Sequence, residues 1–358
     1  MDNEYSIQIQ KIEAELEKWL PGFHDAGIPA FQATSAGSDW AQKMFPEDVK
    51  KIDDESLRVL IAPVKDMLSR GGKRWRPLLM TLVCECLGGG DAVLPLVPIV
   101  EFSHNATLIH DDIEDDSEER RGKPAVHKIY GIDTAINSGS FLYFLALSCI
   151  ESYKGKNKEL IYKLWAEYMR GLHLGQAMDI SWHRKVTFVP TIEEYFVMCG
   201  LKTGSLSRLA AEAGAYTAGA DAKVAARFGD AAESLGIAFQ ILDDVKNLTT
   251  GVPGKLRGDD VVEGKKSLPV LLYLTRYPEK REMVFYCFHA AKINGTAVPE
   301  VEELINTLHA AGVLSESEER AHSMLHEVHD TFSSIEVDKF SENTRSRLLL
   351  NGLIEAVS

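Results

Sequence analysis

The sequence predicts a nearly all-α fold. Apolar residues recur at three- and four-residue spacing along most of the 358 residues, which is the period of amphipathic helices. No stretch shows the sustained alternation typical of strands, and no Asn-Gly turn joins strand-like runs. No internal repeat or Pro/Ser-rich linker divides the chain. We therefore expect one domain over residues 1–358, a single large helical bundle, with residues 1–53 as an N-terminal extension.

The individual helices follow from the same spacing and from the glycines and prolines that interrupt it. Glycine pairs and triplets stand at residues 71–72 and 88–90, and a Gly/Lys-rich stretch covers residues 251–266. The predicted helices cover roughly residues 4–20, 54–68, 77–87, 94–115, 134–153, 158–180, 192–218, 221–248 and 268–277, with several more near the C-terminus.

Composition narrows the class of protein. Apolar residues make up 45% and charged residues 26%, as in soluble globular proteins. The net charge of −14 argues against a general binder of nucleic acid or anionic membranes. The N-terminus lacks the pattern of a signal peptide, and the longest mostly apolar run, residues 141–150, is too short to span a bilayer. Five scattered cysteines indicate reduced thiols, so we expect a cytoplasmic protein with no transmembrane segment.

Residues 104–122, HNATLIHDDIEDDSEERRG, pass from apolar to acidic within one expected helix. On that helix Ala106 and Ile109 fall on the apolar face, whereas Thr107, Asp111 and Asp115 share another. Asp111 and Asp115 lie one turn apart, so their oxygens suit Mg²⁺ that also binds phosphate. A solvated helix end is the commoner explanation of a single acidic cluster.

A second acidic helix is expected over residues 235–248, LGIAFQILDDVKNL, where four polar residues lie opposite an apolar face. They are Gln240, Asp243, Asp244 and Asn247. Like charges at this density repel each other unless cations are expected. Two such helices in one chain make the solvated-surface interpretation the weaker one.

Basic residues beside glycines complete the pattern. GGKRWRP at residues 71–77 places Lys73, Arg74 and Arg76 just before a helix start, where cations and free N–H groups can meet an anion. Arg120 and Arg121 form a second pair, and KTG (202–204) and GKKS (264–267) add lysines. A solvated surface explains each alone. Together with the acids they predict two phosphorylated substrates, one bound through Mg²⁺ and one through Lys and Arg.

Six motifs in order carry a family resemblance between about Ser69 and Leu272: GGKRWRP, HNATLIHDDIEDDSEERRG, GQAMDI, KTG, FQILDDVKN and EGKKSLP. They resemble the trans-isoprenyl diphosphate synthases, and the wider sequence is most similar to geranylgeranyl diphosphate synthases of the eukaryotic type. The resemblance implies a bundle around a deep central cavity, usually a homodimer. It also implies Mg²⁺-dependent condensation of isopentenyl diphosphate with dimethylallyl, geranyl or farnesyl diphosphate.

Carried over by position, the resemblance also implies roles for individual residues. Three Mg²⁺ on the allylic diphosphate would be held by Asp111, Asp115 and Asp243, with Asp112 and Asp244 close by. The allylic diphosphate itself would be contacted by Arg120, Lys202, Lys265, Gln176 and Asp179. Isopentenyl diphosphate would be bound by Lys73, Arg76, His104 and Arg121. The reacting centre would lie beside Thr203 and Gln240.

The second acidic motif departs from the family at Asn247, where most members have a third Asp. A neutral amide can meet a metal-bound water but brings no charge, so metal affinity on that side would be weaker. The geranylgeranyl-type enzymes tolerate Asn here, and we interpret it as a mark of that subtype.

Product length should depend on the residues that line the cavity beside the first acidic helix. One turn before Asp111 stand Ala106 and Thr107, which are too small to stop a chain at fifteen carbons. The next bulky candidates are Phe141, Tyr143 and Phe144, although a place in the ordinary core explains them equally well. We expect a C20 product, and a long-chain synthase stays open because small residues also suit a deeper tunnel.

Three other classes of protein would explain part of this pattern. Two Glu-x-x-His pairs, Glu101 with His104 and Glu319 with His322, have the spacing of di-iron carboxylate bundles, but iron would not explain the Lys/Arg clusters. A non-catalytic subunit of a heteromeric synthase is favoured only by Asn247. A terpene cyclase would have no use for GGKRWRP.

Overall fold

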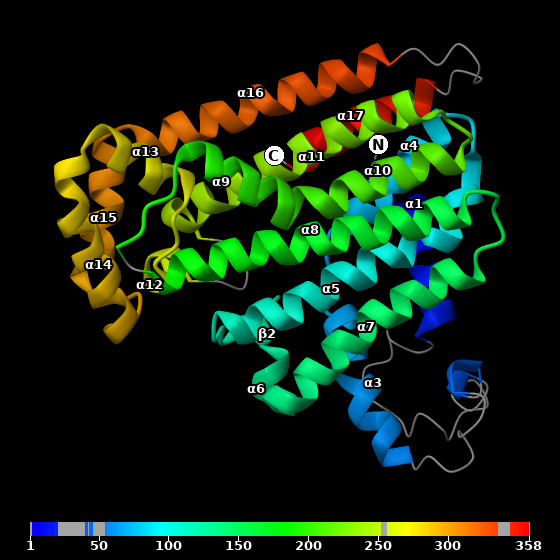
Figure 1. The fold of residues 1–358 in the computed structure, drawn as a ribbon, viewed down its shortest axis with the longest axis horizontal. Coiled ribbons are helices and arrows are strands. Elements are labelled where there is room, and N and C mark those ends of the chain that lie inside the picture. The colour runs from blue at the N-terminus through cyan, green and yellow to red at the C-terminus, as the bar shows by residue number, and fades with distance from the viewer. Residues whose placement is uncertain are drawn as a thin grey trace. The chain divides into compact units, whose positions relative to one another are not determined.

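The structure is a computed structural model that describes residues 2–20, 40–41, 43–45, 54–185, 187–251, 256–335 and 344–357. Within these ranges every regular element is a helix except for one short hairpin (Figure 1), which confirms the predicted all-α class. Much of the expected N-terminal extension, residues 21–39 and 46–53, lies outside the described residues. The chain divides into two compact units, which are described separately, and the single domain stays a prediction.

Unit 1 comprises residues 1–81 and 91–162. Its central helix α5 packs against α7, α1 and α6, and burial of Phe102, Ala106 and Ile109 confirms the apolar face expected for α5. The elements of this part of the chain are α1 (Asp2–Trp19), α3 (Asp54–Ser69), α4 (Trp75–Cys86, which continues into unit 2), η3 (Gly90–Leu96), α5 (Val97–Glu114), β1 (Glu119–Arg120), β2 (Lys123–Pro124), α6 (Val126–Tyr130) and α7 (Ile132–Ser152).

The helix expected from residue 94 begins later, at Val97, because residues 90–96 form the 3₁₀ helix η3. Pro95 lacks an N–H group and restricts the residue before it. Pro98 falls in the first turn of α5, where no donor is needed. By length and composition alone, Gly90–Glu114 is apolar enough to cross a membrane, but 67% of its most apolar window is buried inside the protein, as in the core helices of soluble proteins.

The hairpin β1–β2 was not predicted. Its pairs are Glu119 with Pro124 and Arg120 with Lys123, so Arg121 and Gly122 form a two-residue turn. Both have positive φ, 55° and 73°, as a type I′ turn requires. Asn-Gly is the usual sequence for this turn, and because Arg-Gly stands here instead, the sequence did not indicate a hairpin. A residue with a Cβ is strained in this region, so contacts must hold Arg121 in place.

Unit 2 comprises residues 82–90 and 163–358. Its helix α11 packs against α10, α16 and η4. A capping box between Thr191 and Glu194 starts α9, and Asp221 accepts the N–H of Val224 at 2.9 Å to start α11. The elements are α8 (Lys158–Arg184, which begins in unit 1), α9 (Ile192–Cys199), η4 (Gly200–Gly204), α10 (Ser205–Thr217), α11 (Ala222–Thr249), α12 (Asp259–Glu263), α13 (Leu268–Arg276), η5 (Pro278–Lys280), α14 (Arg281–Asn294), α15 (Pro299–Ala310), α16 (Val313–Ser334) and α17 (Thr344–Val357).

Candidate active site

The first acidic motif lies at the C-terminal end of α5, in unit 1. Asp111 and Asp115 are half-buried, whereas Asp112 is completely buried. Asp112 accepts two hydrogen bonds from the Arg120 guanidinium, one of them from Nε at 2.8 Å, so its charge is balanced. Asp111 Oδ2 lies 3.8 Å from the same guanidinium. Asp112 is therefore buried and paired with Arg120, whereas Asp111 and Asp115 remain partly accessible.

Arg120 and Arg121 are neighbours in the hairpin but bind different partners. Burial lowers the pKa of Arg120, but Asp112 raises it more, so that it exceeds the ordinary arginine value. Arg121 Nη1 donates to the carbonyl of Gly71. A side chain at Gly72, whose φ is 140°, would place its Cβ 3.0 Å from Arg121 Nη2. Gly72 of the GGKRWRP loop thus makes room for Arg121, and Gly71 supplies the carbonyl that Arg121 binds.

Positive charge accumulates around His104 on α5. Burial and the charges of Arg76 and Arg121 hold the pKa of His104 well below its usual value, so the imidazole is neutral at pH 7. Burial, with Arg121 adding to it, lowers the pKa of Arg76 to about 10. Arg76 Nε is buried and has no hydrogen-bond partner among the described residues. Lys73 is exposed in the same loop. A bound anion would stabilise such a group of cations.

The second acidic motif lies on α11 in unit 2, and burial divides it in the same way. Asp243 is half-buried, whereas Asp244 is completely buried. Asp244 accepts hydrogen bonds from Tyr195 Oη and Gln240 Nε2, both at 2.8 Å, and pairs with Lys265 Nζ at 2.9 Å. Both oxygens of Asp244 are therefore occupied, and Asp243 is the more accessible carboxylate of the pair.

Asn247, also on α11, makes two contacts with the segment that follows the helix. Its side chain is buried, and Oδ1 accepts the backbone N–H of Asp260 at 3.2 Å. Its carbonyl accepts the N–H of Gly258 at 3.0 Å. Both contacts tie α11 to the start of α12. The expectation that this amide meets a metal-bound water stays a prediction, because Oδ1 binds the backbone of Asp260 whereas Nδ2 has no hydrogen-bond partner among the described residues.

The KTG motif forms η4, a π-helical turn that interrupts the single helix expected over residues 192–218. Such turns occur frequently at functional sites. A Cβ at Gly175 of α8 would fall on the backbone nitrogen of Lys202, so glycine lets the two segments approach. Gln176, the next residue, is half-buried. Thr203 Oγ1 donates to Gln240 Oε1 at 2.9 Å, which brings these two predicted residues together.

Asp179 of α8 holds Lys202. The carboxylate is buried, and Oδ2 accepts from Lys202 Nζ at 2.6 Å. His183 Nε2 lies 2.8 Å from the other oxygen. Burial raises the pKa of Asp179, but Lys202 and His183 lower it more, so that it falls well below its usual value. Asp179 is therefore ionised at neutral pH, and in this geometry it orients Lys202.

The polyprenyl synthetase family model matches residues 58–308, which is more than half of the chain. The chain belongs to the polyprenyl synthetase family. The resemblance predicted from six ordered motifs is confirmed, and with it the class of enzyme, a prenyltransferase.

Named relatives of this polyprenyl synthetase include a geranylgeranyl pyrophosphate synthase of Neocamarosporium betae. It is 37% identical over 230 residues, or 63% of this chain and 65% of that protein, so the match spans less than two thirds of its length. A geranylfarnesyl diphosphate synthase of Aeropyrum pernix is 32% identical over 301 residues, covering 81% of this chain and 92% of that protein. A crystal structure of a polyprenyl synthase from Caulobacter crescentus CB15, complexed with calcium and isoprenyl diphosphate, is 25% identical with a TM-score of 0.72, covering 89% and 97% of the two chains.

The residues predicted to set product length in this polyprenyl synthetase have different surroundings. Ala106 is completely buried, and Thr107 is half-buried. The Tyr143 ring stacks on His110, with centroids 5.7 Å apart. Phe144 is 66% exposed, which argues against a place in a packed floor. Phe141 packs instead against the rings of Trp40 and Phe45.

Sequence reasoning missed five side chains that hold predicted site residues in place. They are Glu101, Asn105, Tyr195, His183 and Asp260. Two of them had a signal in their spacing, since residues four apart face each other on a helix: Asn105 follows Glu101 by four, and His183 follows Asp179 by four. Tyr195 pairs with a residue 49 positions away, which no local pattern reveals.

The di-iron alternative has no support in the described part of the chain. Glu101 accepts from Arg74 Nη1 at 2.6 Å and from Asn105 Nδ2 at 2.7 Å. Glu319 and His322 are both exposed. Across the described ranges, no group of three or more His, Cys, Asp or Glu side chains is placed to hold a metal ion. All five cysteines lie in the described ranges, are buried and form no disulfide bond.

Proposed function

We propose that this chain condenses isopentenyl diphosphate head to tail with an allylic diphosphate, and that its main product is geranylgeranyl diphosphate. The observation that carries the proposal is the division within both aspartate pairs. Asp112 and Asp244 are buried against Arg120 and Lys265, while Asp111 and Asp243 are partly accessible. Each pair thus combines an anchored cation with oxygen ligands, as binding of a metal-complexed diphosphate requires.

Asp111, Asp115 and Asp243 are the proposed ligands of Mg²⁺, with three ions in each active site. Their carboxylates fit this role because Mg²⁺ takes one or two protein oxygens and completes its shell with water and phosphate. Bound Mg²⁺ supplies positive charge that stabilises the departing diphosphate. Asp112 and Asp244 contribute indirectly, by holding cationic side chains in place.

The chain's own cations are proposed to act on charge that develops during the reaction. The allylic C–O bond breaks, and its electron pair leaves with the diphosphate, where Arg120, Lys202 and Lys265 stabilise the negative charge. The double bond of isopentenyl diphosphate then attacks the allylic carbon, and the new C–C bond forms. The proton lost from the isopentenyl unit passes to the released diphosphate. Thr203 and Gln240 present oxygen dipoles to the carbocation.

Isopentenyl diphosphate is proposed to bind the cations of unit 1 without metal. Arg76 has a buried Nε without a partner among the described residues, and Arg121 and Lys73 add positive charge. His104, whose pKa is lowered by burial and by the neighbouring arginines, is proposed to donate a hydrogen bond to the diphosphate.

A longer prenyl diphosphate is the second candidate for the product. The likeness to a geranylfarnesyl diphosphate synthase covers 92% of that protein, and its named product is one isoprene unit longer. Ala106 and Thr107 are small enough to admit either chain.

A homodimer and a cytoplasmic location complete the proposal, and both follow from the resemblance and the composition. The proposed small-molecule partners are isopentenyl diphosphate and the allylic diphosphates, and no nucleic-acid partner is proposed because the chain carries a net charge of −14.

The test is product analysis with the purified chain alone. It is incubated with Mg²⁺, isopentenyl diphosphate and each of the C5, C10 and C15 allylic diphosphates, and the products are sized by chromatography. We expect a C20 product from each primer and none after chelation of the metal. Condensation by the isolated chain would also exclude a non-catalytic subunit. Absence of product with every primer would refute the proposed function.

A further inference from the structure

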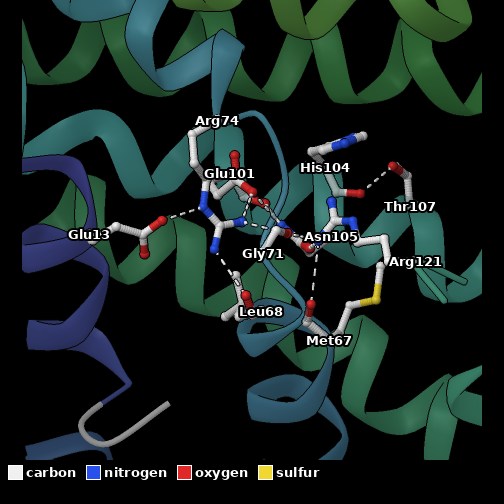
Figure 2. Close-up of polar contacts among 10 residues, drawn as sticks. All are labelled: Glu13, Met67, Leu68, Gly71, Arg74, Glu101, His104, Asn105, Thr107 and Arg121. Carbon is white, nitrogen blue, oxygen red and sulfur yellow. Dashed lines mark hydrogen bonds and ion pairs between the residues drawn. The ribbon is translucent and has the colours of Figure 1, made fainter. Parts of the chain in front are cut away.

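One carboxylate of the N-terminal helix α1 reaches the GGKRWRP loop. Figure 2 shows Glu13 pointing at Arg74, with Glu13 Oε1 2.7 Å from Arg74 Nε. α1 packs against α5 within unit 1. The family match begins at residue 58, so Glu13 lies outside the part of the chain that carries the motifs.

Each nitrogen of the Arg74 guanidinium already has a protein acceptor. Besides Glu13, Nη1 donates to Glu101 Oε1 at 2.6 Å and Nη2 to the carbonyl of Leu68 at 2.9 Å. The side chain is 1% exposed. Burial lowers the pKa of Arg74, but Glu101 and Glu13 raise it more, above its ordinary value. Arg74 is therefore a buried cation between two carboxylates, and it is committed to holding the loop.

The backbone at Arg74 also depends on these contacts. Its φ is 48°, in the left-handed region, which a residue with a Cβ occupies only where surrounding contacts hold it. Arg74 stands between Lys73 and Arg76 in the loop, so its backbone conformation affects the direction of both side chains. Lys73 is exposed and Arg76 is buried.

Glu13 also spares Glu101 for other partners. Glu101 Oε1 accepts from Asn105 Nδ2 at 2.7 Å, and Asn105 Oδ1 lies 3.3 Å from Arg121 Nη1 (Figure 2). Without Glu13, Glu101 would be the one carboxylate left on Arg74. The hydrogen bond between Glu101 and Asn105 would then weaken, and with it the contact between Asn105 and Arg121.

We infer that Glu13 is a positioning residue for isopentenyl diphosphate, which it affects through Arg74 without touching the substrate. This inference rests on the proposed function, because it assigns Lys73, Arg76 and Arg121 to that substrate. It makes α1 a working part of the site although the helix lies outside the family match.

The test is a kinetic comparison of Glu13→Ala, Glu13→Asp and Glu13→Gln with the wild-type chain. Loss of one charge-assisted hydrogen bond should raise KM for isopentenyl diphosphate about tenfold in Glu13→Ala. KM for the allylic diphosphate and kcat should stay within about twofold of wild type, since Arg74 does not hold the residues proposed to bind the allylic diphosphate. Glu13→Asp should recover part of the loss, and Glu13→Gln less. Glu15→Ala is the matched control, because Glu15 lies on the same helix and its carboxylate pairs with the exposed Lys18 of that helix.

A purely structural role for Glu13 would raise both KM values together or lower only stability, and either result would overturn the inference, as would an unchanged KM for isopentenyl diphosphate. A second measurement does not depend on turnover. With EDTA present, inorganic diphosphate should raise the melting temperature of wild type and Glu15→Ala more than that of Glu13→Ala. An equal rise in all three refutes the role of Glu13, whereas absence of condensation by the wild-type chain refutes the proposed function instead.

Discussion

Lys265 Nζ lies 2.9 Å from Oδ1 of Asp244, a carboxylate with no exposed surface. Burial lowers the pKa of Lys265, but Asp244 and Asp260 raise it more, well above its ordinary value. Lys265 is therefore charged at neutral pH. The adjacent Asp243 is partly accessible. Two consecutive aspartates of one motif thus have different physical roles, which mutation should separate.

Asp244→Asn should unfold more easily than Asp243→Asn. Removing one partner of a buried ion pair costs about 3–5 kcal/mol, whereas the change at the partly accessible Asp243 should cost less, about 0.5 kcal/mol. Asp243→Asn should instead lose about 100-fold in apparent Mg²⁺ affinity. Urea unfolding and Mg²⁺ titration of activity measure the two effects. Equal loss of stability in both variants would contradict the division of roles.

Asn247→Asp tests whether a third aspartate would add metal affinity. The side chain of Asn247 is 1% exposed, and its oxygen binds the backbone of Asp260. A carboxylate there would be buried, so we expect a loss of about 1–3 kcal/mol in unfolding free energy and no gain in Mg²⁺ affinity. Thermal unfolding and Mg²⁺ titration are the measurements. Tighter Mg²⁺ binding by the variant would show that the position faces the metal after all.

The helices and their apolar faces could be predicted because they depend on local periodicity, as at Ala106 and Ile109 of α5. The sequence could not predict which aspartate of each pair is buried, since Asp111 and Asp112 have the same chemistry and differ in how closely Arg120 approaches them. The π-helical turn at Gly200–Gly204 and the Arg-Gly hairpin depend on tertiary contacts, at Gly175 and Gly72. The contact between Glu13 and Arg74 joins residues 61 positions apart, beyond any sequence pattern.

Lys266 should make stability depend on pH. The lysine is 2% exposed, its Nζ donates to the Gly264 carbonyl at 2.8 Å, and it lies 4.6 Å from the centroid of the Phe288 ring. Burial lowers its pKa to about 8, from 10.5. Between these two values the unfolded chain binds a proton that the folded chain does not, so this group makes stability rise with pH.

Replacement of Lys266 removes this dependence. Lys266→Met should be about 1–3 kcal/mol more stable than wild type at pH 7, and the gain should shrink as pH rises toward 10.5. Urea unfolding at pH 7 and pH 10 measures the difference. Lys265→Met is the control of opposite sign, because the raised pKa of Lys265 means that its charge stabilises the fold at pH 7. A pH-independent difference for Lys266→Met would contradict the argument.

Product length should respond to Tyr143 but not to Phe144. The Tyr143 ring stacks on His110, the residue before Asp111, at an interplanar angle of 8°, whereas Phe144 is 66% exposed. If the stacked pair limits the growing chain, Tyr143→Ala should shift the main product at least one isoprene unit upward, and Phe144→Ala should leave it unchanged. Chromatographic sizing of products from farnesyl diphosphate measures both. An unchanged product length in Tyr143→Ala would show that residues other than Tyr143 limit the product. A shift in Phe144→Ala would show that this exposed ring faces the growing product.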